Sequence, residues 1–200
     1  HNQTQPYSGL MVRLIVLLGN KGTAYTKTRH NAGWLFGDYV IARCNSVGPW
    51  QSKFNGEWTT ARWNNYVLTI LKPMTYMNLS GQSAWKAASY FKITPQEILV
   101  VHDDVELEFG TVRIQKGGGL AGHNGLRSMK ESLGCDQFMR LRIGIGRPQF
   151  QDVASFVLSR FTPEQESVLP LIADLGIDLL TLVLTSESSV LPLPVSRSLP

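Results

Sequence analysis

The stretch Ile98-Leu99-Val100-Val101-His102-Asp103-Asp104 sets the pattern for this chain, because an apolar run stops at a histidine and two carboxylates. A short apolar run of this kind indicates a buried strand. A second run, Arg13–Leu18, has the same character and leads into the loop Gly19–Arg29. The alternating segment Thr111–Gln115 and the segment Phe138–Ile145 predict two further strands.

Helical patterns lie between these strands. Apolar residues recur at helical spacing after Asn31, which is a candidate N-cap for a helix through Cys44. Ser80 is expected to cap a helix that runs to Phe91. Thr94-Pro95-Gln96-Glu97 is a capping box with proline at the first helical position, so a short turn is expected there. Further helices are predicted at Asn124–Leu133, Asp152–Leu158 and Thr162–Leu184.

Two predicted strands have no helix between them. Lys53–Trp63 and Tyr66–Leu71 are joined at Asn64-Asn65, which favours a hairpin. Strands that alternate with helices indicate an α/β domain, and a hairpin makes its sheet mixed rather than purely parallel. We therefore predict a single α/β domain with a mixed, twisted central sheet flanked by helices.

The length of 200 residues suits one domain. We interpret residues 1–10 as tag or vector residues, residues 11–184 as the domain, and residues 185–200 as a disordered tail rich in Ser, Pro and Leu. No run approaches the ~18 apolar residues of a membrane span, and no signal peptide is visible. With only Cys44 and Cys135, we expect a reducing compartment, no disulfide and no structural zinc.

Charge is distributed unevenly along the chain. Residues 1–150 contain 17 Lys and Arg against 9 Asp and Glu, whereas residues 151–200 contain 2 against 6. A basic main body suits a phosphate-rich partner such as a nucleic acid. The alternative is a basic surface with no binding role.

Polar clusters follow the apolar runs, and ligands of open α/β sheets bind at the carboxyl ends of strands. His30 precedes a predicted helix and suits a general base, because imidazole titrates near neutrality. The positive end of that helix would lower the pKa of His30 and keep it neutral at pH 7. Taken alone, such a histidine is more often a surface or capping residue.

Two further clusters carry amides and carboxylates. Asn78 lies at a helix entrance, where its amide can hold a carbonyl or an oxyanion; the alternative is a turn residue that satisfies backbone groups. In His102-Asp103-Asp104, a carboxylate can orient an imidazole through its N–H, or it can serve as a cap or solvated turn. Metal binding by the two aspartates lacks an evident third ligand.

The segment Gly117–Gly125 is rich in glycine but lacks the Gly-Lys-Ser/Thr ending of a nucleotide P-loop. It fits a flexible lid beside His123-Asn124, or a plain connector. Neither a Gly-x-Ser-x-Gly elbow nor a catalytic cysteine context is present. The polar set therefore favours a hydrolase in which a base activates water, without a metal or cofactor. Cations for phosphates are supplied by Lys116, Arg127, Lys130, Arg140, Arg142 and Arg147.

Five motifs then occur in order. They are Gly19-Asn20 with Thr28-Arg29-His30-Asn31-Ala32-Gly33, Lys72-Pro73 with Met77-Asn78-Leu79-Ser80-Gly81, His102-Asp103, Gly117-Gly118-Gly119 with Gly122-His123-Asn124-Gly125, and Arg140–Gly146. Together they resemble the bacterial-type peptidyl-tRNA hydrolase family over about residues 11–184. The resemblance implies an α/β fold of the phosphorylase/hydrolase-like type and hydrolysis of the ester that joins a peptide to the 3′ ribose of tRNA.

The resemblance also implies partners and roles. The partner would be peptidyl-tRNA, bound through its acceptor stem and 3′ CCA end by a cytoplasmic monomer, with no membrane and no cofactor. His30 would be the general base and Asp103 its orienting partner. Asn20, which completes the catalytic set, would position the peptide carbonyls and the water together with Asn78 and Asn124. Tyr25 and Met77 would contact the substrate, His123 would lie on the mobile lid, and Lys116 and Arg142 would bind phosphates.

Two other functions stay open at this point. The first is a family-related RNA-binding module without hydrolase activity, as in the similar chloroplast splicing factors. It is motivated by departures from the family pattern at Leu120-Ala121 and by the acidic C-terminal helix. The second is an α/β enzyme that processes nucleosides or nucleotides, which the missing P-loop and dinucleotide fingerprint disfavour.

Overall fold

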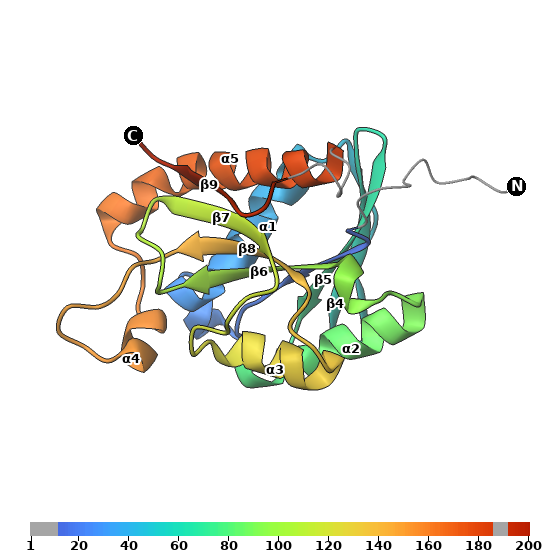
Figure 1. Cartoon of the computed structure of the whole chain (residues 1–200), viewed down its shortest axis with the longest axis horizontal. Coiled ribbons are helices and arrows are strands. Elements are labelled where there is room, and N and C mark those ends of the chain that lie inside the picture. Colours follow the sequence, from blue (N-terminus) through green and yellow to red (C-terminus); the bar gives the residue numbers. More distant parts are fainter. Residues whose placement is uncertain (1–11, 186–191) are drawn as a thin grey trace, which may run out of the picture.

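The computed structural model describes residues 12–185 and 192–200. They form one central sheet with helices on both of its faces (Figure 1). The strand order is β2-β4-β5-β1-β6-β8-β7-β9, with β3 paired to β4. The central strands β5 (Tyr66–Pro73), β1 (Leu14–Leu17), β6 (Ile98–Asp104) and β8 (Met139–Gly144) run parallel. Their carboxyl ends meet at one edge of the sheet, so the polar segments that follow them come together there.

The outer strands are antiparallel, which confirms a mixed sheet. The strand β4 (Gly56–Trp63) pairs with β5, and the two are joined at Asn64-Asn65 as expected. At the opposite end of the strand order, β7 (Thr111–Lys116) pairs antiparallel with β8.

The predicted strand Lys53–Trp63 is wrong in one respect, because the chain turns inside it. Phe54 and Asn55 have positive φ angles of 61° and 51°. This turn folds β3 (Gln51–Lys53) back onto β4. The two-residue strand β2 (Ser46–Val47) also pairs with β4.

Helices cover both faces of the sheet (Figure 1). On one face, α1 (Ala32–Arg43) and α5 (Pro163–Thr185) share a core with the side chains of Leu99 and Val101. On the other face, α2 (Ser80–Phe91) and α3 (Asn124–Leu133) share a second core. Both faces of β6 are buried, as its continuous apolar run predicts.

The expected helix caps are corrected at two positions. Asn31 is the N-cap of α1 but makes no side-chain cap hydrogen bond, and the N-cap of α2 is Leu79, so that Ser80 is the first residue of the helix. The amide of Asn31 instead bonds the backbone of Asn20, and the Ser80 hydroxyl donates to the Met77 carbonyl at 2.7 Å. The capping box at residues 94–97 is confirmed and precedes the short 3-10 helix Pro95–Glu97.

Helix α5 corrects the expectation that no segment is apolar enough for a membrane span. Its best 18-residue window has a mean hydropathy of 2.0, and 44% of that window is buried. Helices in protein cores share this length and composition. Phe36 of α1 packs so closely on Gly176 of α5 that a Cβ there would lie 2.6 Å from the ring. The helix thus contributes to the core beneath the sheet.

The disordered tail predicted for residues 185–200 is wrong for its last part. Val195–Ser198 forms β9, which pairs antiparallel with β7. The free edge of β7 offers unpaired backbone groups, and β9 satisfies them. The predicted tag at residues 1–10 and the segment 186–191 lie outside the described residues.

Candidate active site

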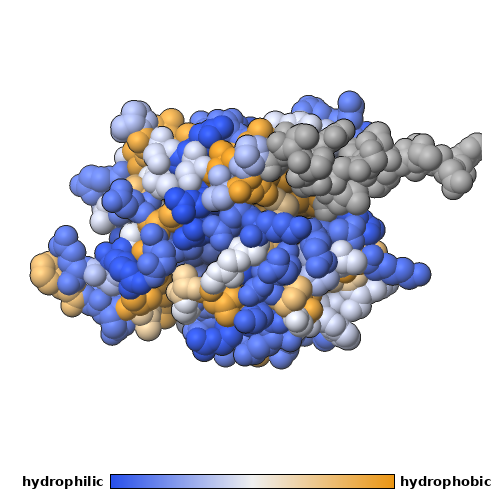
Figure 2. Space-filling model, in the orientation of Figure 1, coloured by the Kyte–Doolittle hydropathy of each residue, from blue (hydrophilic) through white to orange (hydrophobic). Residues whose placement is uncertain are grey.

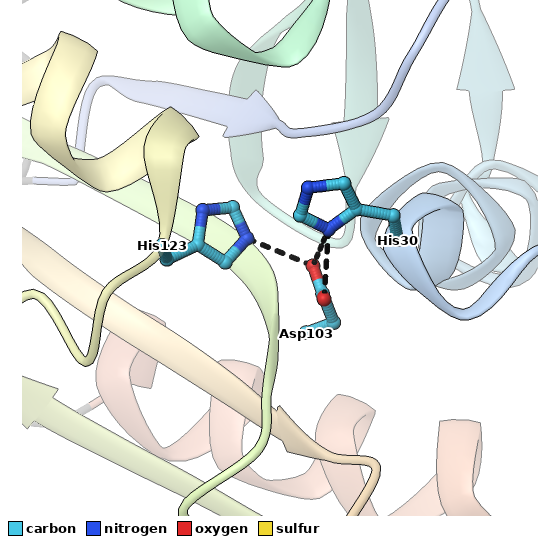
Figure 3. A group of neighbouring side chains, drawn as sticks. All are labelled: His30, Asp103 and His123. Carbon is cyan, nitrogen blue, oxygen red and sulfur yellow. Dashed lines mark hydrogen bonds and ion pairs between the residues drawn. The ribbon is translucent and has the colours of Figure 1, made fainter. Parts of the chain in front are cut away.

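His30 and Asp103 form a buried pair at the carboxyl edge of the sheet. His30 lies in the short 3-10 helix Arg29–Asn31, just before α1, and Asp103 lies near the end of β6. The Nδ1 atom of His30 is 2.9 Å and 3.1 Å from the two oxygens of Asp103. Since a carboxylate only accepts, Nδ1 carries the proton, and Nε2 is left as a base. Figure 3 shows that Nε2 points away from Asp103.

The same carboxylate also holds His123 (Figure 3). The Nε2 atom of His123 lies 2.8 Å from Oδ1 of Asp103. The Nδ1 atom accepts from the backbone N–H groups of Gly125 and Leu126, so His123 is the N-cap of α3. Nε2 must therefore carry the proton. His123 was expected on a mobile lid; in the structure its side chain is buried and has partners at both ring nitrogens.

The electrostatics of the pair differ from the expectation. Burial lowers the pKa of His30, but the charge of Asp103 and the hydrogen bond to it outweigh burial, so the pKa lies above its usual value. The expected lowering by a helix end is wrong because the ring nitrogen faces a carboxylate. Burial alone would raise the pKa of Asp103, but the two imidazoles hold that pKa well below its usual range. Asp103 therefore stays ionised.

The two neighbours of Asp103 have other partners. Nδ1 of His102 donates to the Asp103 carbonyl at 2.8 Å, and burial followed by the nearby His123 lowers the pKa of His102 to about 4. His102 is therefore neutral at pH 7. Asp104 accepts from Nε of Arg142 at 2.7 Å and from the backbone N–H of Glu106. Neither side chain therefore competes with Asp103 for the hydrogen bond from Nδ1 of His30.

Asn20, on the loop after β1, is fixed in one orientation by Met77 and Asn31. Its Oδ1 accepts from the backbone N–H of Met77 at 2.7 Å, which leaves Nδ2 as a donor without a partner in the described part of the chain. The side chain of Asn31, next to His30, bonds both the N–H and the carbonyl of Asn20. No local sequence pattern indicates this role of Asn31, since its partner lies eleven residues earlier.

The remaining predicted residues are spread more widely. His30, Asp103, His123 and Asn124 line a cavity of about 270 Å³ with Val105 and Val157. Met77 is buried, and its Sδ lies where Gly125 lacks a side chain. Asn78 is exposed, Tyr25 is half-buried, and neither has a side-chain hydrogen bond among the described residues.

The predicted phosphate ligands lie apart from each other. Lys116 lies opposite Met139 at the start of β8, whereas Arg142 lies opposite His102 near the site. Lys116 is exposed, but Arg142 is mostly buried and paired with Asp104 and Gln115. The structure thus brings Arg142, but not Lys116, toward the buried pair.

His30, Asp103 and His123 also form a group whose potential metal-ligand atoms lie within 4.8 Å of one another. A neutral imidazole that binds a metal through Nε2 carries its proton on Nδ1. In His123, Nδ1 accepts two backbone N–H bonds and cannot carry one. The arrangement fits a hydrogen-bond network better than a metal centre.

A model of the peptidyl-tRNA hydrolase family matches residues 14–191. The chain belongs to this family. It is 45% identical to the peptidyl-tRNA hydrolase of Pelobacter propionicus over 88% of this chain and 90% of the relative. It is 44% identical to that of Treponema pallidum over 91% and 92% of the two chains. These matches confirm the resemblance inferred from the five motifs.

Solved structures agree with the family assignment. The peptidyl-tRNA hydrolase of Acinetobacter baumannii superposes with a TM-score of 0.79 at 34% identity, covering 86% of this chain and 88% of that one. A uridine phosphorylase from Vibrio fischeri reaches a TM-score of 0.50 at 8% identity, which shows a shared fold alone. The predicted fold class is confirmed. The relatives carry the name of a hydrolase, which favours the enzyme over a binding module.

Proposed function

We propose that this member of the peptidyl-tRNA hydrolase family cleaves the ester between a peptide and the 3′ ribose of tRNA, with His30 as the general base. The observation that carries the proposal is the Nδ1 contact of His30 with Asp103, which leaves Nε2 unprotonated. A base with a pKa near the working pH suits proton removal from water. Such cleavage would recycle tRNA in the cytoplasm during translation.

In this mechanism water attacks the ester carbonyl and His30 Nε2 takes its proton. The imidazolium that forms is stabilised by ionised Asp103, which stays a carboxylate throughout. The free Nδ2 of Asn20 is the donor best placed to hold a substrate carbonyl, because Met77 fixes its amide. Asn124, on the cavity wall, and exposed Asn78 would position the peptide. The proton then returns to the 3′ oxygen of the ribose as it leaves.

The tRNA would lie on the side of the site formed by β8 and β7. Arg142 and Arg113 are register partners on these strands, and Lys116 lies at the end of β7. Figure 2 shows that hydrophilic residues predominate across the middle of this face. Phosphates of the acceptor stem would bind there, with the 3′ CCA end directed toward His30 and Tyr25. We expect one copy of the chain to act as a monomer.

Incubation of the wild-type protein with an N-acetyl-aminoacyl-tRNA tests this function. We expect release of free tRNA and the N-acetyl amino acid without added metal, measured by acid precipitation of the labelled amino acid. Binding of the tRNA without release would instead support an RNA-binding module. Chelator in the reaction controls for contaminating metal hydrolases.

His123 is expected to be a positioning residue that acts through Asp103. His123→Asn keeps a side-chain acceptor for the N-cap of α3 but is too short to reach Asp103, whereas His123→Ala loses both contacts. Both variants should lose activity about tenfold, because each loses a hydrogen bond to a charged group. His123→Ala should have an unfolding free energy about 1 kcal/mol lower than that of His123→Asn, measured in urea, because only the alanine also loses the N-cap of α3. Unchanged activity in His123→Asn would show that capping is its only role.

A further inference from the structure

Two lysines lie over aromatic rings, Lys21 on the loop after β1 and Lys72 near the end of β5. Nζ of Lys21 is 5.2 Å from the ring centroid of Tyr76, whose surface is 54% exposed. The backbone N–H of Lys21 also donates to the carbonyl of Thr75 at 3.3 Å. The two loops are therefore joined at the point where Lys21 meets Tyr76.

Lys72 forms a similar arrangement near the end of β5. Its Nζ is 4.8 Å from the ring of Trp34 and 6.0 Å from that of Trp50, which is 40% exposed. Trp34 packs on Gly19, where a Cβ would lie 2.6 Å from the ring, and its Nε1 donates to Leu17. Lys72 is thus connected to the same loop as Lys21. We call these five residues the lysine–aromatic rim: Lys21, Trp34, Trp50, Lys72 and Tyr76.

The cations of the rim have no acidic partner in the part of the chain that the structure describes. Within residues 12–185 and 192–200, neither Lys21 nor Lys72 lies in an ion pair. Glu57 lies opposite Lys72 in the β4–β5 register but makes no ion pair with it. Ammonium groups held over aromatic faces keep their charge while part of each ring stays open. Such a surface suits a ligand that combines a carboxylate with apolar groups.

The position of the rim indicates which part of the substrate it meets. In the strand order β5-β1-β6-β8-β7, the rim lies at β5 and β1, Asp103 on β6, and Arg142 on β8. The buried pair therefore lies between the rim and the surface proposed for tRNA. Asn20, beside Lys21, bonds both Met77 and Asn31, so the rim is continuous with the site. If the ester of peptidyl-tRNA lies at His30 and its tRNA lies toward β8, its peptide lies on the opposite side, toward β5.

We propose that the lysine–aromatic rim is a subsite for the peptide and favours acidic side chains near the ester. This specificity rests on the proposed hydrolysis of peptidyl-tRNA. Attraction between a carboxylate and two partly solvated lysines is modest and depends on salt. A preference of about fivefold for an acidic over a neutral isosteric residue is expected.

The test compares two substrates built on one tRNA, N-acetyl-Asp-Phe-tRNA and N-acetyl-Asn-Phe-tRNA. The wild type should cleave the Asp substrate with a kcat/KM about fivefold higher at low salt. Lys21→Gln and Lys72→Gln should each reduce this ratio, and the double variant should bring it close to one. Lys92→Gln, which removes one charge at the far end of α2, should keep the wild-type ratio.

Three outcomes distinguish the alternatives. Equal cleavage of both substrates by the wild type overturns the acidic preference and leaves the hydrolase function standing. Absence of cleavage of either substrate contradicts the proposed function itself. Weaker binding of deacylated tRNA to the two lysine variants, with an unchanged Asp to Asn ratio, would assign the rim to RNA and overturn the proposal.

Discussion

Replacing His30 with alanine is expected to lower kcat for peptidyl-tRNA by about 10²–10⁴-fold, the usual contribution of a general base. The Kd for deacylated tRNA should stay unchanged, because the surface proposed for phosphates lies on β7 and β8. Single-turnover hydrolysis of an N-acetyl-aminoacyl-tRNA measures the first quantity, and filter binding of deacylated tRNA measures the second.

Stability is the necessary control for this variant. His30 is buried, so its loss also removes packing and one hydrogen bond to Asp103. Urea unfolding of His30→Ala should show that the folded state remains fully populated under assay conditions. Turnover within about tenfold of the wild type in a folded variant would exclude His30 as the general base.

Much of the fold follows from local patterns. The apolar run at Ile98–His102 has both faces buried in β6, and helical spacing located α1 between β1 and the hairpin. The chain direction of these strands follows from the helices between them, so the carboxyl edge that carries Asp103 was predictable. The pairing of His30 with Asp103 came from the resemblance, and the structure brings the two together.

Other features depend on contacts that no local pattern encodes. Pairing of Val195–Ser198 with β7 is a long-range event, and its serines bond Thr111 and Arg113 across the register. The local pattern around Asn31 is typical of a helix N-cap. Its side-chain amide instead forms hydrogen bonds with the backbone of Asn20, which requires the loop between them to fold first. The raised pKa of His30 likewise depends on a carboxylate 73 residues away.

The carboxylate of Asp103 has a more specific task than adding negative charge. It accepts hydrogen bonds from two imidazoles at once, one from Nδ1 of His30 and one from Nε2 of His123. The tautomer of His123 cannot change, because its Nδ1 accepts from the backbone of α3. Any side chain at position 103 must therefore still accept a hydrogen bond from Nε2 of His123. Only its second terminal atom is then available to Nδ1 of His30.

Asp103→Asn is expected to lower kcat by about 10³–10⁴-fold with little change in fold, because an amide has only one acceptor atom. Its oxygen would go to His123, so its NH₂ would face Nδ1 of His30 and move the proton of that ring to Nε2. The base would then be in the wrong tautomer.

The pH dependence separates this explanation from a simple loss of packing. In the wild type the pKa of His30 is raised above 6.5, so kcat/KM should fall as the pH drops through that raised value. Without the carboxylate only burial remains, which lowers the pKa, so the midpoint of the residual activity should move to lower pH. Asp104→Asn removes a carboxylate that pairs with Arg142 instead, and it should leave the midpoint where the wild type has it. A midpoint that stays unchanged in Asp103→Asn would contradict the role of Asp103 as the partner that sets both the tautomer and the pKa of His30.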